Sequence, residues 1–168
     1  MTAYHTVFIS HAHADNATVA DYAARLRAKG IDLWLDLNDA QKGHDLSDDI
    51  TDQLERRTAF LLMVTAASNE SRWVKMELSN YISLYNNKQK YLVNGVERII
   101  LPIRLEDVAI HGRVAFTNWI DAVGRDRQQV IDEIVRALQV AAQPAHPSPS
   151  PAPPHLPSPS AERQPIPI

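Results

Sequence analysis

The segment Ser71–Leu78, SRWVKMEL, places an aromatic ring and a carboxylate four residues apart. Four residues are about one helical turn, so Trp73 and Glu77 are neighbours on one side of a predicted helix. Together they offer a ring that can stack on a planar group and a carboxylate that can stabilise a positive charge. The plain alternative is a solvated glutamate that stabilises the helix start, beside a half-buried tryptophan. Sequence chemistry alone favours that alternative.

The same helix contains an apolar stripe that fixes its orientation. Residues at helical spacing are predicted to face the core, and they are Val74, Leu78, Tyr81, Ile82 and Tyr85. Trp73 and Glu77 lie on one flank of this stripe, in the first turns of the helix. The flank can therefore face a cleft, and we expect Glu77 to behave as a surface residue in its effect on stability.

Two predicted strands end in polar side chains that can contact a ligand. Ser10 and His11 follow the apolar run at the N-terminus, and Asp36 follows the run Gly30–Leu35. Ser10 and the backbone N–H groups beyond it can bind phosphate or ribose oxygens. The alternative for Ser10 is a turn residue. For Phe8, two residues earlier, a place in the core is favoured over contact with a ligand.

Two other kinds of site were weighed and are disfavoured. His11-Ala-His13-Ala-Asp15 matches the opening of a two-metal hydrolase motif. That motif continues with a histidine where this chain has Asn16, and it needs a longer fold; Asp15 is more simply predicted to cap the first helix. A phosphoacceptor site would need an aspartate where this chain has Thr65 at the end of a strand. We therefore expect no metal site.

Strand and helix signals alternate along the first 143 residues. Apolar runs predict strands at 6–9, 31–35, 59–65, 98–103 and 116–120, and helical spacing predicts helices over 19–26, 46–54, 71–87 and 130–138. Gly30 is expected to end the first helix. This alternation predicts right-handed βαβ units, hence an α/β fold with a five-stranded parallel sheet and helices on both faces. Ligands of such sheets bind beyond the carboxyl ends of the strands, which selects the loops 10–16, 36–45 and 66–72.

The proline distribution divides the chain. Of the 168 residues, 11 are proline, and 10 of these lie in the last 25 residues. We expect one folded domain over 1–142, followed by a Pro/Ser-rich disordered linker or tail over 143–168. A spacer of this kind usually joins two parts, so a further domain beyond it is expected.

Composition excludes several classes of protein. There is no cysteine, hence no disulfide framework, thiol nucleophile or thiolate metal site. A formal net charge of −3 does not favour nucleic-acid binding. The chain has no run of 18 apolar residues and no basic secretory start, so we expect no membrane association and a cytoplasmic location.

Three segments together resemble the Toll/interleukin-1 receptor (TIR) family, over about residues 4–141. They are Val7–His11 with Asp15 following, the strand Gly30–Asp36, and the helix segment Ser71–Leu78 with its Trp-x-x-x-Glu pattern. The loop Asp36–Asp45 lacks the Arg-Asp…Pro-Gly signature of animal receptor members and has Lys42-Gly43-His44 instead. That departure favours the bacterial, NAD-cleaving type.

The resemblance implies a flavodoxin-like TIR fold and an activity. NAD-cleaving members have their essential glutamate at the position of Glu77, so the resemblance implies that Glu77 is catalytic. It also implies that substrate contacts come from the predicted strand ends and from the tryptophan, namely Phe8, Ser10, His11, Asp36 and Trp73. NAD⁺ would then be the substrate, and no cofactor would be held permanently. The expected function is that of an NAD⁺ glycohydrolase or ADP-ribosyl cyclase in signalling or defence. The alternative is a non-catalytic module that signals by homotypic assembly.

The chemistry of NAD⁺ suits a single carboxylate. The nicotinamide is a cationic leaving group that departs neutral, so no general acid has to protonate it. The remaining need is to stabilise an oxocarbenium-like ribosyl transition state, which differs from the two-carboxylate arrangement of ordinary glycosidases. Attack by water gives ADP-ribose and attack by an internal nucleophile gives a cyclic isomer; the sequence leaves both open.

The loop 36–45 is the expected assembly element. In TIR enzymes this loop contacts a neighbouring protomer, so the resemblance implies self-association in which Lys42, Gly43 and His44 take part. Gly43 suits a turn with positive φ. Lys42 and His44 could also close on phosphates, although a solvated loop is favoured over that role.

Overall fold

A computed structural model describes residues 2–35, 37 and 48–141 of the chain. The elements, in chain order, are β1 (Val7–Ser10), the short 3₁₀ helix η1 (His13–Asp15), α1 (Asn16–Ala28), β2 (Leu33–Leu35), α2 (Asp48–Arg56), β3 (Ala59–Val64), α3 (Ala66–Glu70), α4 (Arg72–Asn86), β4 (Leu92–Val93), β5 (Val96–Glu97), β6 (Ile99–Arg104), β7 (Ile120–Asp121) and α5 (Arg127–Ala137). The predicted tail, residues 143–168, lies outside the described residues.

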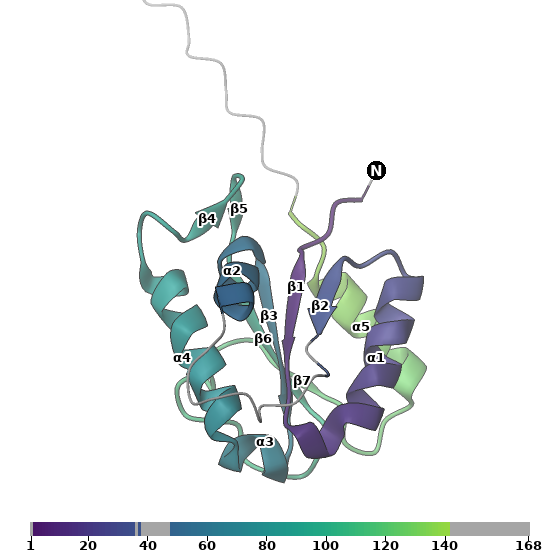
Figure 1. Cartoon of the computed structure of the whole chain (residues 1–168). Helices are drawn as coiled ribbons and strands as arrows, with labels where there is room; N and C mark the ends of the chain where they lie inside the picture. The colour runs from purple at the N-terminus through teal and green to yellow at the C-terminus, as the bar shows by residue number, and fades with distance from the viewer. Residues whose placement is uncertain (1, 36, 38–47, 142–168) are drawn as a thin grey trace, which may run out of the picture.

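The five main strands form one parallel sheet in the order β2-β1-β3-β6-β7. This is the flavodoxin-like α/β order, and it confirms the predicted fold class. The order reverses between β1 and β3, because the chain runs from β1 outward to β2 and then returns to the other side. β1 runs downward from the N-terminus in Figure 1, so the lower edge of the sheet is its carboxyl edge.

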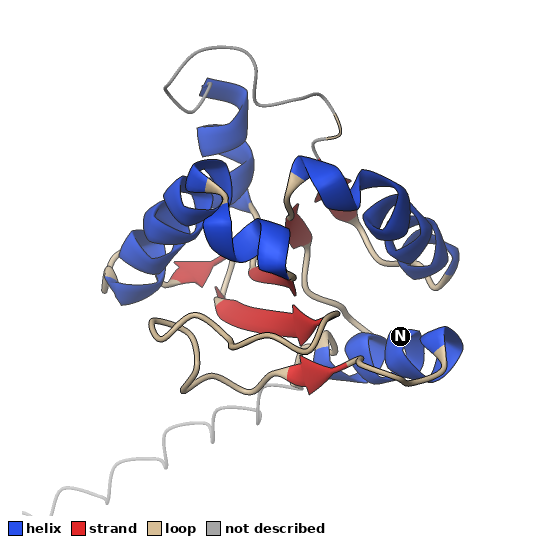
Figure 2. Cartoon of the chain, turned by 90° about the horizontal axis from the view of Figure 1, so that it is seen from below, coloured by secondary structure: helices blue, strands red, loops and turns tan. Residues whose placement is uncertain are grey.

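Helices cover both faces of this sheet. Figure 1 shows α1 and α5 on one side and α2 and α4 on the other, and Figure 2, seen from below, shows helices on both sides of the strands. Neighbouring residues of β3 therefore enter different cores: Leu61 packs with α1 and α5, whereas Phe60 and Leu62 pack with α2 and α4. A strand buried on both faces reads as a continuous apolar run, as AFLLMV does.

Gly30 ends α1 as predicted. Its φ is +85°, and its N–H donates to the carbonyl of Arg27, while the N–H of Ile31 donates to the carbonyl of Leu26. This is the left-handed helix end that glycine adopts with little strain.

The predicted fifth strand over 116–120 is wrong in its extent. Only Ile120 and Asp121 form β7, and the side chain of Phe116 is 78% exposed. An apolar run predicts burial only if something covers it, and residues 116–119 instead belong to a loop. Three further elements were not predicted: the 3₁₀ helix η1, the five-residue helix α3 and the hairpin β4–β5.

None of the helices in the described part of the chain combines the length and the apolar character needed to cross a lipid bilayer.

Candidate functional site

A short hydrogen bond joins the end of β1 to α4. The Ser10 hydroxyl donates to Oε2 of Glu77 at 2.5 Å, and the two side chains are only 1% and 3% exposed. Ser10 is the last residue of β1, next to the point where the strand order reverses. The carboxylate therefore lies where open α/β sheets bind their ligands.

The local sequence explains why Glu77 points inward. The Ser71 hydroxyl accepts a bond from the N–H of Val74 and so starts α4, which then buries Val74, Leu78 and Tyr81. Glu77 is the sixth residue of α4 and is buried beside this stripe. The solvated helix-start alternative is therefore wrong, and so is the premise that Glu77 lies at the surface; its small expected effect on stability stays a prediction. The flank of the stripe is covered, and β1 supplies the polar partner that a buried carboxylate needs.

The two aromatic candidates, Phe8 and Trp73, differ in how deeply they are buried. Phe8 is fully buried, with its ring stacked on Trp34 at a centroid distance of 5.0 Å and on Phe60 at 5.6 Å. Its side chain is part of the core. Trp73 is partly buried and packs against the α2–α4 side of the core, so part of its surface remains accessible one turn from Glu77.

His11 is buried and connected to the surface by a chain of side-chain bonds. Its Nε2 lies 2.7 Å from Oδ1 of Asn16, and Nδ2 of Asn16 lies 3.1 Å from Nδ1 of His13. An amide oxygen only accepts and an amide nitrogen only donates, so His11 carries a proton on Nε2 and His13 accepts at Nδ1. This chain fixes the orientation of His11 directly after Ser10.

The histidines and the aspartate of the metal-like motif have separate partners. Asp15 accepts a bond from the Thr65 hydroxyl at 2.6 Å, while His11 and His13 bond to Asn16. Within residues 2–35, 37 and 48–141, no group of three or more His, Asp or Glu side chains is arranged to hold a metal ion.

The prediction that the Asp15 side chain caps α1 is wrong. Asp15 occupies the cap position, but its carboxylate makes no capping bond and instead accepts from Thr65, which follows β3. Thr65 also accepts from the N–H of Ser68 and so starts α3. Asp15 thus joins the loops after β1 and β3 at the position where the strand order reverses.

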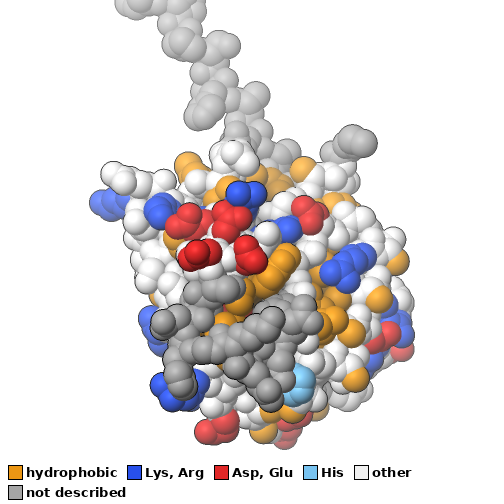
Figure 3. Space-filling view, in the orientation of Figure 1, with side chains coloured by type: hydrophobic (Ala, Val, Ile, Leu, Met, Phe, Trp, Pro, Cys, Tyr) orange, Lys and Arg blue, Asp and Glu red, His pale blue; other side chains and the backbone are white. Residues whose placement is uncertain are grey.

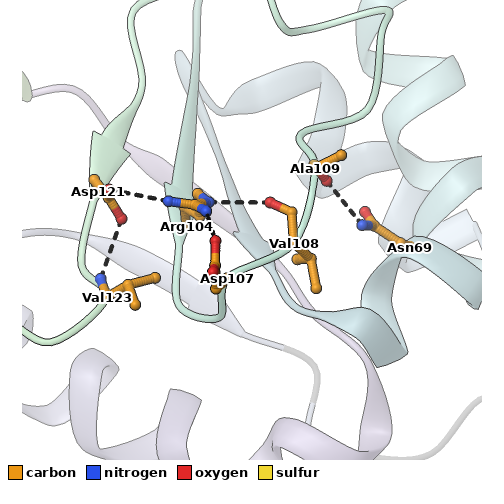
Figure 4. Close-up of polar contacts among 7 residues, drawn as sticks. All are labelled: Asn69, Arg104, Asp107, Val108, Ala109, Asp121 and Val123. Carbon is orange, nitrogen blue, oxygen red and sulfur yellow. Dashed lines mark hydrogen bonds and ion pairs between the residues drawn. The ribbon is translucent and has the colours of Figure 1, made fainter.

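Sequence reasoning missed the loop 105–119, which lies at the same edge of the sheet. Figure 4 shows how Arg104 holds its start: the guanidinium donates to the carbonyl of Val108 and to the carboxylates of Asp107 and Asp121. Asn69 of α3 donates to the carbonyl of Ala109 at 2.9 Å. An arginine at a strand end followed by an acidic turn was the signal available in the sequence.

The loop 105–119 also reaches α4. Arg113 donates to the hydroxyl of Ser79 at 2.8 Å, two residues beyond Glu77, and Val114 is fully buried in the core beside α4. These contacts place the loop beside the helix that carries Glu77.

Four of the predicted residues lie outside the described part of the chain. They are Asp36, Lys42, Gly43 and His44. The structure therefore brings Ser10 and Glu77 together, with His11 directly after Ser10 and Trp73 one turn from Glu77.

Comparison with known proteins identifies the type of domain. The family model described as TIR domain matches residues 7–138. Solved structures with this fold include the TIR domain of a Toll-related receptor from Hydra magnipapillata, with a TM-score of 0.61 and 17% identity over 81% of this chain and 98% of that one. They also include a TIR-STING receptor from C. gigas in complex with 2',3'-cGAMP, with a TM-score of 0.58 and 20% identity over 79% of this chain. This chain spans 38% of the length of that receptor. No curated protein matches the sequence.

Proposed function

This chain belongs to the TIR domain family, and from that premise we propose that it is an NAD⁺ glycohydrolase or ADP-ribosyl cyclase of the bacterial effector type. The observation that carries the proposal is the buried Ser10–Glu77 hydrogen bond at the carboxyl edge. Burying a carboxylate costs free energy that an exposed helix position would avoid. A carboxylate in this position can stabilise positive charge that develops on a bound substrate.

Glu77 is the proposed catalytic residue. The bond between C1′ of the ribose and the nicotinamide nitrogen breaks, and its electron pair neutralises the pyridinium. The ribosyl centre becomes positively charged, and Glu77 stabilises that charge in surroundings where water screens it little. The incoming oxygen of water, or an internal nucleophile of the substrate, then forms the new bond to C1′ and releases a proton.

Ser10 is proposed to position Glu77 and to contact the ribose. A hydroxyl rotates about its C–O bond, so a ribose hydroxyl can replace Ser10 as the donor to Glu77 while Ser10 turns to a substrate oxygen. His11 and Asp36 are proposed to contact the polar part of the same ligand. Trp73 offers its accessible surface to a planar ring of NAD⁺, which is the substrate and not a resident cofactor.

The proposal includes self-association. Members of this family assemble through contacts between TIR domains, and we propose that the loop containing Lys42, Gly43 and His44 makes such a contact. Specific activity is then expected to rise with protein concentration, and substitution of Lys42 or His44 to weaken the rise. Activity strictly proportional to enzyme concentration in a monomeric protein contradicts this part.

We propose that the chain acts in a cytoplasmic signalling or defence protein that has a further domain beyond the proline-rich segment.

A non-catalytic signalling module is the second candidate function. The observation that favours it is the exposure of Phe116 and Trp119, 78% and 43%, on a well-anchored loop, as a docking surface would have.

The experiment is an assay of nicotinamide release. Concentrated protein, with and without a crowding agent, is incubated with NAD⁺, and the products are separated by chromatography. Release of nicotinamide with ADP-ribose or a cyclic isomer is expected. Absence of nicotinamide from a sample shown by sedimentation to be assembled contradicts the enzyme and favours the non-catalytic module.

A further inference from the structure

An open hollow lies at the end of α4 and is lined by Tyr85, Asn86, Lys88 and Tyr91. We call it the tyrosine groove; its volume is about 410 Å³. The two tyrosine rings meet edge to face, with 5.4 Å between their centroids and 87° between their planes. Aromatic walls of this kind are the surfaces on which proline-rich segments dock in peptide-binding domains.

The groove also offers hydrogen-bond donors. Lys88 supplies an ammonium group and Asn86 an amide, both on exposed side chains. Figure 3 shows Lys and Arg side chains gathered over the segment between α4 and β4, next to the groove. A polyproline II segment has carbonyl groups without internal hydrogen bonds and, at each proline, no N–H. The groove therefore suits such a segment in its hydrogen bonding as well as in its aromatic surface.

The chain itself contains a segment of this chemistry. Of its 11 prolines, 10 lie in the last 25 residues, and Pro151–Pro157 reads PAPPHLP. A polyproline II helix has three residues per turn, so Pro151, Pro154 and Pro157 fall on one face of it. One face then presents a proline ring at each of three successive turns, as an aromatic groove requires.

The groove and the start of the proline-rich segment lie at the same edge of the sheet. His5, two residues before β1, donates its N–H to the carbonyl of Leu138, so the chain leaves α5 at the amino end of β1. Arg98, just before β6, donates its N–H to the carbonyl of Tyr91, so the groove lies at the amino end of β6. Figure 1 shows the hairpin β4–β5 and the end of the described chain, in yellow-green, both at the upper end of the molecule.

The segment is close enough in sequence to reach the groove. Only β3 separates β1 from β6, and neighbouring strands are about 4.8 Å apart, so their amino ends are about 10 Å apart. Pro151 is 10 positions after Ala141, the last described residue. Ten residues in polyproline II conformation span about 30 Å. This length covers the distance between the two strands and leaves about 20 Å to pass the hairpin.

A shallow groove is sufficient for a ligand on the same chain. A short connection holds such a ligand at an effective concentration in the millimolar range. A contact that is too weak to form between separate molecules is then formed in a large part of the population.

From these observations we propose that Pro151–Pro157 docks as a polyproline II helix in the tyrosine groove of the same chain. Its proline rings pack on Tyr85 and Tyr91, and Lys88 donates to its carbonyl oxygens. The contact directs the proline-rich segment along the amino edge of the sheet, away from the carboxyl edge where Glu77 lies. It is independent of the proposed enzymatic activity.

The test is paramagnetic relaxation in the NMR spectrum of the full chain. The chain has no cysteine, so Ser160→Cys provides a single position for a nitroxide label just beyond the docked segment. We expect the amide signals of residues 85–91 to weaken at least about twofold relative to the reduced label, because about half or more of the molecules are docked. The signals of α3, at the carboxyl edge, should keep their intensity. Equal weakening of both sets of signals, or of neither, would overturn the proposal.

Proline variants of the labelled chain test the proposed face. Pro151→Ala, Pro154→Ala and Pro157→Ala together should restore the signals of residues 85–91. The matched control removes as many prolines from another face and should leave the weakening in place; it combines Pro147→Ala, Pro153→Ala and Pro159→Ala. Weakening that survives the first set, or is lost equally in the control, contradicts the assignment of the face.

Groove variants test the other side of the contact. Tyr91→Ser removes one wall and should restore the signals, and the spectrum itself verifies the fold. Lys88→Ala is a second groove variant should Tyr91→Ser unfold, with Lys75→Ala, an exposed lysine of α4 outside the groove, as its control. A groove variant that behaves like the parent argues against docking at this site.

A mixture of two samples identifies the chain that supplies the segment. One sample carries ¹⁵N and no nitroxide, and the other carries the nitroxide and no ¹⁵N. The signals of residues 85–91 should keep their intensity in this mixture. Weakening there would mean that the segment of a second copy occupies the groove, and it would overturn docking within one chain. No arm of the test involves NAD⁺, so its failure is distinct from failure of the enzymatic proposal.

Discussion

Glu77 and Arg98 are both charged and almost fully buried, 3% and 2% exposed, at opposite ends of the sheet. Arg98 lies just before β6, its guanidinium is 5.3 Å from the centre of the Tyr81 ring, and it donates to main-chain oxygens. These oxygens belong to Leu54, Glu55, Arg57 and Lys90. Glu77 instead receives the hydroxyl of Ser10, a donor that can rotate.

Under the proposed function, this difference separates a structural charge, Arg98, from a catalytic one, Glu77. Arg98 satisfies carbonyl groups at the end of α2, which no helical N–H reaches, and ties them to the segment before β4. Arg98 bonds to main-chain oxygens, whose positions are fixed by the fold. Glu77 is bonded to a hydroxyl that can rotate, at the edge where parallel sheets bind ligands, and the proposed function has a substrate hydroxyl replace it.

The largest expected effect on stability is at Arg98. Arg98→Met keeps most of the side-chain volume but removes the donor to one buried and three partly buried carbonyl groups, and an unsatisfied buried group costs about 1–3 kcal/mol. We expect the free energy of unfolding to fall by about 3 kcal/mol or more, measured by urea denaturation. Arg56→Met, at an exposed arginine on the same helix end, is the matched control and should cost less than about 1 kcal/mol. Equal losses of unfolding free energy in the two variants would contradict the structural role assigned to Arg98.

A smaller effect is expected at Ser10. Ser10→Ala removes the donor to the Glu77 carboxylate, and hydrogen bonds to charged groups contribute about 1.5–3 kcal/mol. NAD⁺ cleavage should fall about tenfold or more, with a loss of about 1 kcal/mol or more in unfolding free energy. Ser83→Ala, at an exposed serine of α4 that bonds to the carbonyl of Ser79, is the control and should change neither quantity appreciably. An unchanged rate in Ser10→Ala argues against the positioning role.

The fold was more predictable from the sequence than the site. Apolar runs in β1, β3 and β6 and the helical stripes of α1, α4 and α5 gave the correct architecture, because burial against a sheet produces those periods directly. The hairpin was missed although Asn94-Gly95 is a strong turn signal, and both residues have positive φ. Its strands are two residues each, which is too short to show the alternation that predicts a strand.

The burial of Glu77 could not be predicted from helical spacing. Its partner Ser10 is 67 residues earlier, and only the packing of β1 beside α4 brings the two together. Phe116 is the opposite case: its aromatic side chain suggests burial, yet none of the described residues covers it. Local sequence indicates which side chains are apolar, whereas tertiary packing decides which are covered.

The smallest expected effect is on the pH dependence of stability and involves His5, at the amino end of the sheet. His5 is buried, bonds to the Thr58 hydroxyl at 3.0 Å, and burial lowers its pKa below the ordinary value. The folded state therefore binds a proton less readily than the unfolded chain. The stability that comes from burying neutral His5 is fully present above a pH of about 6.5. It is lost as the pH falls towards the lowered pKa of His5. His5→Gln should reduce the difference in unfolding free energy between pH 8 and pH 5.5; an unchanged difference would contradict the assignment.

The most direct test of the distinction between Glu77 and Arg98 is to measure rate and stability together in Glu77→Gln. Glutamine retains an acceptor for Ser10 and removes only the charge. The account predicts that nicotinamide release falls by at least about 10²–10³-fold, the usual cost of losing an electrostatic group of this kind. It also predicts that the free energy of unfolding changes by less than about 1 kcal/mol or rises, because a charge leaves a buried position. Glu70→Gln, the same change at an exposed residue of α3, controls for the loss of one negative charge and should leave both quantities unchanged. Cleavage of NAD⁺ at the parent rate by folded Glu77→Gln, or a loss of stability as large as that of Arg98→Met, would contradict the account.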